Sequence, residues 1–302
     1  MAAPLPLTFF PPRRRGLILH SGLALVFLAG SAAGLFFALQ QQGSGPFILL
    51  LLLSLGLFLP LPFIFYRAYA LYSARYVLER DGLRLRWGLR AEDIPLPTIE
   101  WVRPAGELGY RLPLPPLAFP GAISGTRHVE ELGEVEFMAA DVDDILLVAA
   151  PHKVYAISPE DPRSFVRAFH NAIEMGSITP LMPYTAQPAA FARRVWNDRP
   201  ARAFLIAGFV LTVILLVIVS LTVPAQASVS IGFDPQGLPQ EPVPAQQLFL
   251  LPVLGTFAFI ANLSLGLFFY RRESDRPIAF MLWISSAFTP LLLIAATLII
   301  LL

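Results

Sequence analysis

The clearest candidate chemistry belongs to four arginines that lie close together in the chain: Arg80, Arg84, Arg86 and Arg90. Arg84 and Arg86 are two residues apart in an alternating stretch, so on a β-strand they would share one face. A guanidinium group donates hydrogen bonds in a planar fork that fits phosphate, which makes this face a candidate contact for a lipid headgroup or a protein partner. The alternative interpretation is a solvated strand face opposite an apolar one.

Other reactive side chains lack the spacing of a site. Seven acidic residues crowd into residues 130–144 and could offer oxygen ligands to a hard cation: Glu130, Glu131, Glu134, Glu136, Asp141, Asp143 and Asp144. They do not follow the EF-hand pattern, so we interpret them as the surface charge of a hairpin. The four histidines show no metal-ligand spacing, and Ser124 does not fit a Gly-x-Ser-x-Gly elbow. The sequence therefore predicts no catalytic residue, no metal and no cofactor, and the protein is expected not to be an enzyme.

Composition is typical of a membrane protein. Of the 302 residues, 56% are hydrophobic and 14% are charged, whereas soluble proteins carry about 25% charge. The absence of cysteine excludes disulfides and thiol catalysis. Residues 71–200 hold 14 of the 22 basic and 17 of the 21 acidic residues, so this segment is negatively charged. That balance argues against nucleic acid as a partner and also against a phosphoinositide-type lipid.

Five apolar stretches are long enough to cross a hydrocarbon core of about 30 Å as helices. They cover residues 16–39, 46–70, 202–223, 247–270 and 278–302. Pro60 and Pro62 are expected to kink the second span or to mark its end. The first span could also be a signal peptide, but it exceeds the usual apolar length and a second span follows at once, which favours an uncleaved helix.

The charges of the connecting segments predict the orientation in the membrane. Arginines precede the first span, follow the second, lead into the third and separate the fourth from the fifth. The segments 40–45 and 224–246 contain neither Lys nor Arg. By the positive-inside rule, the N-terminus is cytoplasmic and the C-terminus is extracytoplasmic. The predicted organisation is a cytoplasmic N-terminus (1–15), a two-helix hairpin (16–70), a cytoplasmic domain (71–178), a linker (179–201) and three further spans (202–302) with an extracytoplasmic loop at 224–246.

The domain between the second and third spans alternates like a sheet and ends like a helix. Residues 75–80 and 83–87 predict a hairpin, with Asp81-Gly82 as a type I′ turn. Further strands are predicted at 94–102, 133–139, 144–150 and 153–157, and an irregular segment at 109–125. Asp161 is placed to cap a helix that has Pro162 at its first position. Its expected apolar stripe is Phe165, Val166, Phe169 and Ile173.

This pattern resembles the bacterial pleckstrin-homology-like (bacterial PH) domains of integral membrane proteins of unknown function. The residues that carry the resemblance are 76–88 (YVLERDGLRLRWG), 94–99 (IPLPTI) and 154–165 (VYAISPEDPRSF). It covers about residues 75–175 and implies a seven-stranded, bent antiparallel sheet that is capped by a C-terminal helix. The fold class is therefore an α-helical polytopic membrane protein with an inserted α+β PH-like domain. PH-type domains that bind phosphoinositides place basic residues near their first hairpin, where Arg80, Arg84, Arg86 and Arg90 lie.

A second resemblance concerns the segment before the fourth span. Residues 229–237 (VSIGFDPQG) are similar to a short domain shared with SdpI-like immunity membrane proteins. In that family a His precedes the Phe-Asp/Asn pair, whereas Gly232 stands there in this chain.

Two functions remain open. In the first, the PH-like domain binds a protein partner, a second copy of the chain or the membrane surface. In the second, the five helices form a small transporter or an immunity-type protein, and the domain regulates them. The second function requires a polar pathway through the spans, whereas the first requires only a docking surface.

Overall fold

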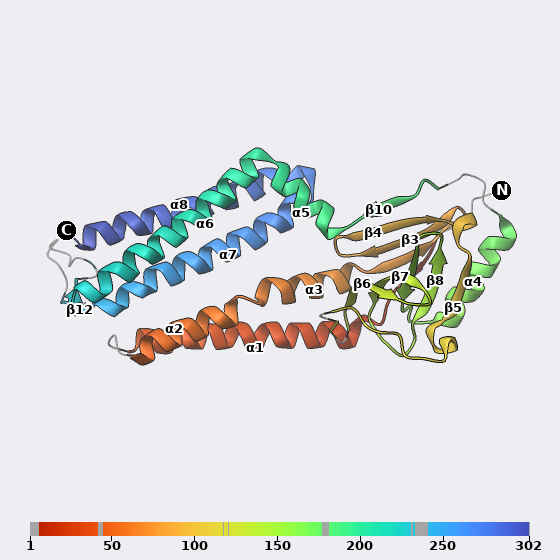
Figure 1. Cartoon of the computed structure of the whole chain (residues 1–302), viewed down its shortest axis with the longest axis horizontal. Coiled ribbons are helices and arrows are strands. Elements are labelled where there is room, and N and C mark those ends of the chain that lie inside the picture. The colour runs from red at the N-terminus through yellow and green to blue at the C-terminus, as the bar shows by residue number, and fades with distance from the viewer. Residues whose placement is uncertain are drawn as a thin grey trace. The chain divides into compact units, whose positions relative to one another are not determined.

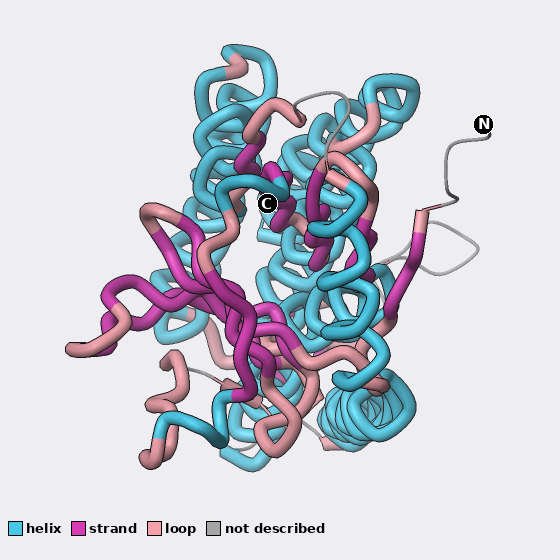
Figure 2. Tube along the Cα trace, turned by 90° about the vertical axis from the view of Figure 1, so that its right-hand side faces the viewer, coloured by secondary structure: helices cyan, strands magenta, loops and turns pink. Residues whose placement is uncertain are grey.

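The computed structural model describes residues 6–41, 45–116, 118–119, 121–176, 181–230, 232 and 241–301. The chain divides into two compact units. One comprises Met1–Leu23 and Phe63–Ala192, and the other comprises Ala24–Pro62 and Arg193–Leu302. We call them the sheet unit and the helical unit. Figure 1 labels their elements, and Figure 2 distinguishes helices (cyan) from strands (magenta).

Within the described residues, five helical segments are long and apolar enough to cross a membrane: Arg13–Leu39, Pro46–Ser73, Arg199–Ala225, Ala245–Tyr270 and Glu273–Leu301. The prediction of five spans is therefore confirmed, with ends that differ by a few residues. The long helices are α1 (Arg13–Leu39), α2 (Gly45–Phe58), α3 (Leu61–Ser73), α6 (Arg199–Thr222), α7 (Leu250–Tyr270) and α8 (Arg276–Leu301). The break between α2 and α3 falls at Leu59 and Pro60, as the two prolines predicted.

Small and hydroxyl side chains bring the helices of the helical unit together. Ser31 on α1 and Ser54 on α2 donate to each other's backbone carbonyls, at 2.9 and 2.7 Å. A Cβ on Gly34 would lie 3.2 Å from Ser54, and one on Gly208 would lie 2.8 Å from the Ser286 hydroxyl. These glycines let neighbouring helix backbones approach closely, which is the packing role expected of small residues in membrane helices. A Cβ on Gly22 would meet nothing within 4 Å, so that glycine does not share the role.

The first sheet of the sheet unit is antiparallel and has the order β1-β2-β3-β4-β10. Its strands are β1 (Leu7–Phe9), β2 (Arg75–Leu78), β3 (Gly82–Trp87), β4 (Arg90–Pro95) and β10 (Tyr184–Ala186). The two outer strands come from segments that the sequence analysis left outside the domain, at 1–15 and 179–201. Each has only three residues, so it carries too little alternation for a sequence pattern to indicate a strand.

The second sheet has the order β5-β8-β9-β7-β6. Its strands are β5 (Trp101–Pro104), β6 (Ile123–Val129), β7 (Gly133–Ala139), β8 (Leu146–Ala150) and β9 (Lys153–Ile157). The pair β7–β9 is parallel, because the β8–β9 hairpin inserts with β9 beside β7. Residues 75–175 thus contain eight described strands, divided between two sheets. The expectation of one sheet with seven strands is therefore wrong in the number of strands and in the number of sheets.

The second sheet is covered by apolar side chains on both of its faces. One face joins β2, β3, β4 and helix α4 (Pro162–Met175) in a cluster that includes Leu83, Leu85, Trp87, Met138 and Phe165. The other face is covered by part of the irregular segment 105–118, including Leu108 and Leu112. Burial on both faces explains why β7, β8 and β9 have nearly continuous apolar runs.

Helix α4 starts as its sequence predicts. The Ser164 amide donates to Asp161 Oδ1 at 2.9 Å, and Pro162 occupies the first turn. The buried side chains are Phe165, Phe169 and Ala172, whereas Ile173 is 48% exposed. The expected stripe is therefore wrong at Ile173, because the buried face continues along i+3 and i+4 positions from Phe165 to Ala172.

The first hairpin differs from its prediction by one residue. Leu78 pairs with Leu83, and Glu79 exchanges backbone hydrogen bonds with Gly82, so the two-residue loop is Arg80-Asp81. Gly82 is therefore the first residue of β3 and not part of the turn. It lies close to Ile94 of β4, since a Cβ on Gly82 would be 2.5 Å from the Ile94 carbonyl oxygen. The predicted strand 94–102 is also interrupted, by a 3₁₀ turn at Leu96–Thr98.

The remaining described elements are short: α5 (Pro188–Asn197), β11 (Ser228–Val229), β12 (Val243–Pro244) and the 3₁₀ turns Ala105–Leu108, Val223–Ala225, Ala245–Phe249 and Glu273–Asp275. Strands β11 and β12 pair with each other within the loop 224–246. Most of the segment 229–237 lies outside the described residues.

Candidate functional site

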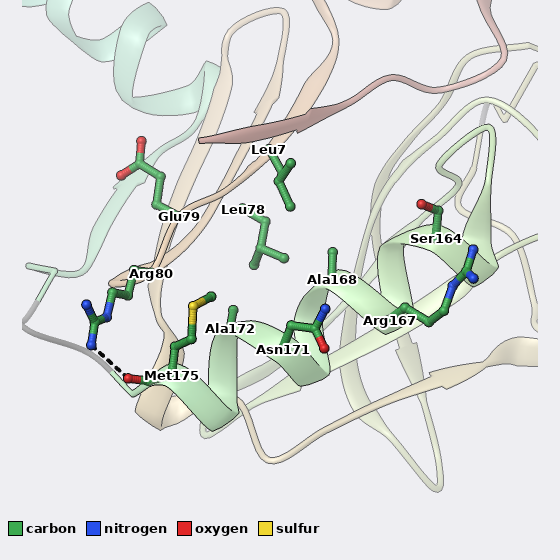
Figure 3. A pocket seen from close by; sticks show the side chains of 10 residues that line it. All are labelled: Leu7, Leu78, Glu79, Arg80, Ser164, Arg167, Ala168, Asn171, Ala172 and Met175. Atoms are coloured by element: carbon green, nitrogen blue, oxygen red, sulfur yellow. Dashed lines mark hydrogen bonds between the residues drawn. The ribbon is translucent and has the colours of Figure 1, made fainter. Parts of the chain in front are cut away.

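A groove of about 390 Å³ runs between helix α4 and strands β1 and β2 of the first sheet (Figure 3). Its apolar walls come from Leu7 on β1, Leu78 on β2, and Ala168, Ala172 and Met175 on α4. The polar lining residues are Glu79, Arg80, Ser164, Arg167 and Asn171. A groove with apolar walls and a mixed polar rim can hold an extended or helical polypeptide segment.

Backbone contacts fix one end of the groove. Arg80 donates from Nε to the Gly176 carbonyl at 2.6 Å and from Nη2 to the Met175 carbonyl at 2.8 Å (Figure 3). These carbonyls belong to the C-terminal end of α4, where a cation is favourable. Arg167 differs from Arg80, because it is exposed and has no partner among the residues that the structure describes. Arg167 is therefore the basic rim group that can bind a ligand.

The chain's own N-terminal segment lies along this side of the sheet. Strand β1 pairs with β2 in the register Leu7↔Leu78 and Phe9↔Tyr76. The Phe9 ring packs edge-on against Phe165 of α4, with ring centroids 5.1 Å apart. The Phe10 carbonyl accepts a hydrogen bond from the Glu160 amide at 2.9 Å. The edge of β2 thus accommodates an added extended segment, in the geometry of strand addition.

The four arginines named by the sequence do not converge on one point. Arg80 binds the end of α4, and Arg84 pairs with Glu79 at 3.0 Å. Arg86 pairs with Asp93 at 2.6 Å, and Arg90 pairs with Glu136 at 2.5 Å. Leu83, Leu85 and Trp87 are buried on the opposite face of β3, as the alternation predicted. Each guanidinium has an internal partner, and their contact with a headgroup or a partner remains a prediction.

The sequence analysis missed a buried polar cluster between the two sheets. Glu136 of β7 is fully buried and pairs with both Arg90 and Lys153, the latter at 3.1 Å. Glu92 of β4 is also buried, and its Oε2 accepts hydrogen bonds from Thr185 at 2.7 Å and from Tyr155 at 3.2 Å. Lys153 is the only lysine of the chain. Because Thr185 lies on β10, the cluster ties the segment that follows the domain to the sheets.

Burial is the main cause of the raised pKa values of Glu92 and Tyr155 in this cluster. It raises the pKa of Glu92, the nearby Glu136 raises it further, and the bonds from Thr185 and Tyr155 and the charge of Lys153 oppose the rise. Burial beside these carboxylates also raises the pKa of the Tyr155 phenol well above its ordinary value. The Glu92 Oε1 atom has no hydrogen-bond partner in the described part of the chain. A buried carboxylate with an oxygen that lacks a hydrogen-bond partner favours its protonated form.

The cluster also corrects the interpretation of the acidic run 130–144. Glu136 was expected to be surface charge, but β7 is buried on both faces and turns this side chain between the sheets. The sequence signal was its position inside an apolar run, Val135 to Ala139, where an ion partner is required. Among the described residues, no group of three or more His, Cys, Asp or Glu side chains is placed to hold a metal ion.

Residues 74–173 match the family model described as "Bacterial PH domain". No curated protein and no solved structure matches the chain. These comparisons give no support for the SdpI-like resemblance of residues 229–237, which stays a prediction. The chain is therefore a polytopic membrane protein by its five apolar helices, and the domain inserted between its second and third spans is similar to the bacterial PH domain, as residues 76–88, 94–99 and 154–165 indicated.

Proposed function

We propose that this chain is a non-enzymatic integral membrane protein that presents its PH-like domain to the cytoplasm as a docking module for a protein partner. The observation that carries the proposal is the groove between α4 and strands β1 and β2, which has apolar walls and a polar rim. PH-like folds that bind polypeptides need such a surface, and β1 gives an internal example of a segment added to this edge.

The charges of the connecting segments support the orientation. The segment 40–45 and the described parts of 224–246 contain no basic residue, whereas arginines flank the other ends of the spans. By the positive-inside rule this arrangement supports an orientation with the sheet unit and the N-terminus in the cytoplasm and the C-terminus outside.

The alternative of a transporter or immunity-type protein has less support. It requires polar groups that face a pathway through the helical unit. The hydroxyls of Thr212, Thr256, Ser264 and Ser286 each donate to a carbonyl three or four residues earlier in their own helix. Ser31 and Ser54 satisfy each other. These bonds are those of packed helices, so the domain is the better candidate for the active part.

Filling the groove tests the proposal. Ala168→Arg places a long side chain on the groove wall, whereas His170→Arg places the same side chain on an exposed part of α4 outside the groove lining. Both variants are compared with the wild type by crosslinking and mass spectrometry in native membranes. We expect crosslinks between residues 160–176 and a partner to persist in His170→Arg and to be lost in Ala168→Arg. Equal crosslinking in the two variants would contradict the groove as the docking site.

A second comparison separates protein docking from headgroup binding. The double variant Arg84→Gln/Arg86→Gln removes two guanidinium groups that form ion pairs with Glu79 and Asp93, and Arg86 also donates to the Leu85 and Glu92 carbonyls. Under this proposal the variant keeps its protein crosslinks. If the variant loses both its partner and its binding to anionic vesicles, recognition of a headgroup at β3 is the better account.

A further inference from the structure

Two buried polar side chains lie where α1 and α3 leave the core of the sheet unit. His20 on α1 is 1% exposed, and Arg67 on α3 is 5% exposed. Leu17, Ala70 and Leu71 of the same helices pack into the core of the domain, about one turn away. The pair therefore marks the boundary between the folded domain and the apolar spans.

The antiparallel register of the two helices places His20 level with Arg67. Arg13 donates to the Ala74 carbonyl, and a Cβ on Gly16 would lie 2.5 Å from Leu71. Moving four residues forward along α1 from Gly16 and four back along α3 from Leu71 reaches His20 and Arg67. Each step covers about 6 Å, so the two side chains occupy the same level of the helix pair.

Each of the two side chains has a buried nitrogen with no hydrogen-bond partner among the described residues. The His20 Nδ1 lies 2.7 Å from the Gly16 carbonyl and donates to it, because a carbonyl oxygen can only accept. Its Nε2 is buried and has no partner among the described residues, and the same is true of Arg67 Nη1. Unpaired buried polar atoms are costly, so in a native protein each calls for an explanation, and a bound ion or water is one such explanation.

Aromatic rings form the walls around these nitrogens. The Arg67 guanidinium lies 5.0 Å from the Phe63 ring centre and 5.6 Å from that of Phe119, and the His20 ring is 6.2 Å from Phe119. Phe63 and Phe119 are 47% and 42% exposed, so the guanidinium lies one ring below the surface. Phe119 thus covers both polar side chains.

The loop that carries Phe119 is fixed by a contact between two glycines. Gly121 has a φ of +82°, and a Cβ there would lie 2.2 Å from the Gly16 Cα atom. An isolated bridge pairs Phe119 with Ala122. The backbone of the loop therefore lies directly against α1, one turn before His20. This close approach requires glycine at both positions 16 and 121.

We propose that Arg67 and His20 form a binding site for a phosphate group. The guanidinium donates a charge-assisted hydrogen bond from Nη1, and the second contact of the phosphate is with His20 Nε2, which donates to a phosphate oxygen when both ring nitrogens carry a proton and accepts from a phosphate hydroxyl when it does not. Arginine suits phosphate because its charge is permanent and its donors are planar. The position beside the apolar spans favours the phosphate of a phospholipid headgroup, and a free phosphate ion offers the same chemistry. This site does not depend on the docking groove, with which it shares no residue.

Binding to the full chain in a phosphate-free maltoside detergent tests the site. Calorimetric titrations use dioctanoyl phosphatidic acid in one arm and inorganic phosphate in the other. We expect Arg67→Gln to weaken binding about tenfold or more, through loss of a charge-assisted hydrogen bond. Arg15→Gln is the matched control, because Arg15 is an exposed arginine at the start of α1, the helix that carries His20. Tighter binding of the lipid identifies a headgroup as the source, whereas equal binding identifies the free ion.

Substitutions at His20 keep the proposal testable if Arg67→Gln does not fold. His20→Gln retains a neutral nitrogen donor near the Nε2 position and should bind phosphatidic acid more tightly than His20→Leu does. His20→Leu has no donor there and should weaken binding. The proposal is overturned if neither phosphate compound binds, or if His20→Leu and Arg67→Gln bind as tightly as Arg15→Gln. A bound water between the two nitrogens would give that result.

Discussion

The polar side chains between the two sheets pair with one another within a small volume, apart from Glu92 Oε1, which has no partner among the described residues. Glu136 neutralises Arg90 and Lys153, and Glu92 receives two hydroxyl hydrogen bonds. Such a buried set holds strands in one register, because each member would be costly to leave alone. It also gives the domain a group, Glu92, whose protonation is linked to folding.

Replacing Glu92 should change the pH dependence of stability. Burial raises the folded-state pKa of Glu92 above its ordinary value of 4.5. Between the unfolded and the folded pKa the folded protein binds more protons, so the free energy of unfolding falls as the pH rises through this window. Glu92→Gln removes this dependence while keeping a carbonyl oxygen for Thr185 and Tyr155. We expect the variant to match or exceed the wild type in Tm at about pH 8, and to lose that advantage at about pH 4.

The matched control for Glu92→Gln is Glu174→Gln, which changes an exposed carboxyl on α4. Melting curves of the purified proteins in detergent, recorded across this pH range, provide the measurement. Glu174→Gln should follow the wild-type curve. A Glu92→Gln curve that ran parallel to the wild type at every pH would contradict the linkage.

At the scale of elements, the contact of β1 with α4 can be measured directly. Phe9→Ala removes the ring that packs on Phe165. For a half-buried aromatic side chain we expect a loss of about 1–2 kcal/mol in the local stability of β1 on β2. Hydrogen exchange of the β2 amides, followed by mass spectrometry, should then accelerate by roughly 5- to 30-fold.

Leu7→Ala is the control for Phe9→Ala. Leu7 lies on the same short strand but is 51% exposed, so its truncation should change the exchange of β2 by less than about fivefold. If the two variants had the same small effect, β1 would not be held by its aromatic side chain.

Elements with long patterns or strong caps could be predicted from the sequence, and short ones could not. The five spans, the strands at 133–139 and 153–157, and the capped start of α4 were foreseen because period and capping residues act locally. Strands β1 and β10 were missed because three residues carry no period and their partners are distant in sequence. Gly82 was assigned to a turn because its role depends on Ile94, which only the fold brings near.

The same distinction separates the arginines of β3 from the residues that line the groove. The arginines of β3 could be assigned to an outward face by alternation alone. The groove could not be predicted, because it is lined by residues from β1, from the β2–β3 turn and from α4, which are far apart in sequence. The pairing of Glu92 with Thr185 spans 93 residues and depends on the path of the chain after the domain.

For the whole molecule, the proposed orientation can be tested on a background without cysteine. Single replacements Gln41→Cys and Glu241→Cys should react with a membrane-impermeant maleimide in intact cells. Arg127→Cys, which is exposed on β6, should react only after the membrane is permeabilised. Labelling of Arg127→Cys in intact cells would place the PH-like domain on the opposite side.

The two outer strands of the first sheet, β1 and β10, lie close in sequence to membrane spans, so a force on those spans would act first on these strands. Strand β1 ends four residues before α1 begins, and β10 precedes the third span by about a dozen residues. Tension that draws these spans apart would reach the sheet at β1 and β10, which are its outermost strands. Each pairs with its neighbour over only three residues, a shorter register than those of β2–β3 and β3–β4, so we expect each to detach before β2, β3 and β4 separate. The shortest strand pairings of the first sheet, β1–β2 and β4–β10, are therefore the ones that connect most directly to the first and third spans.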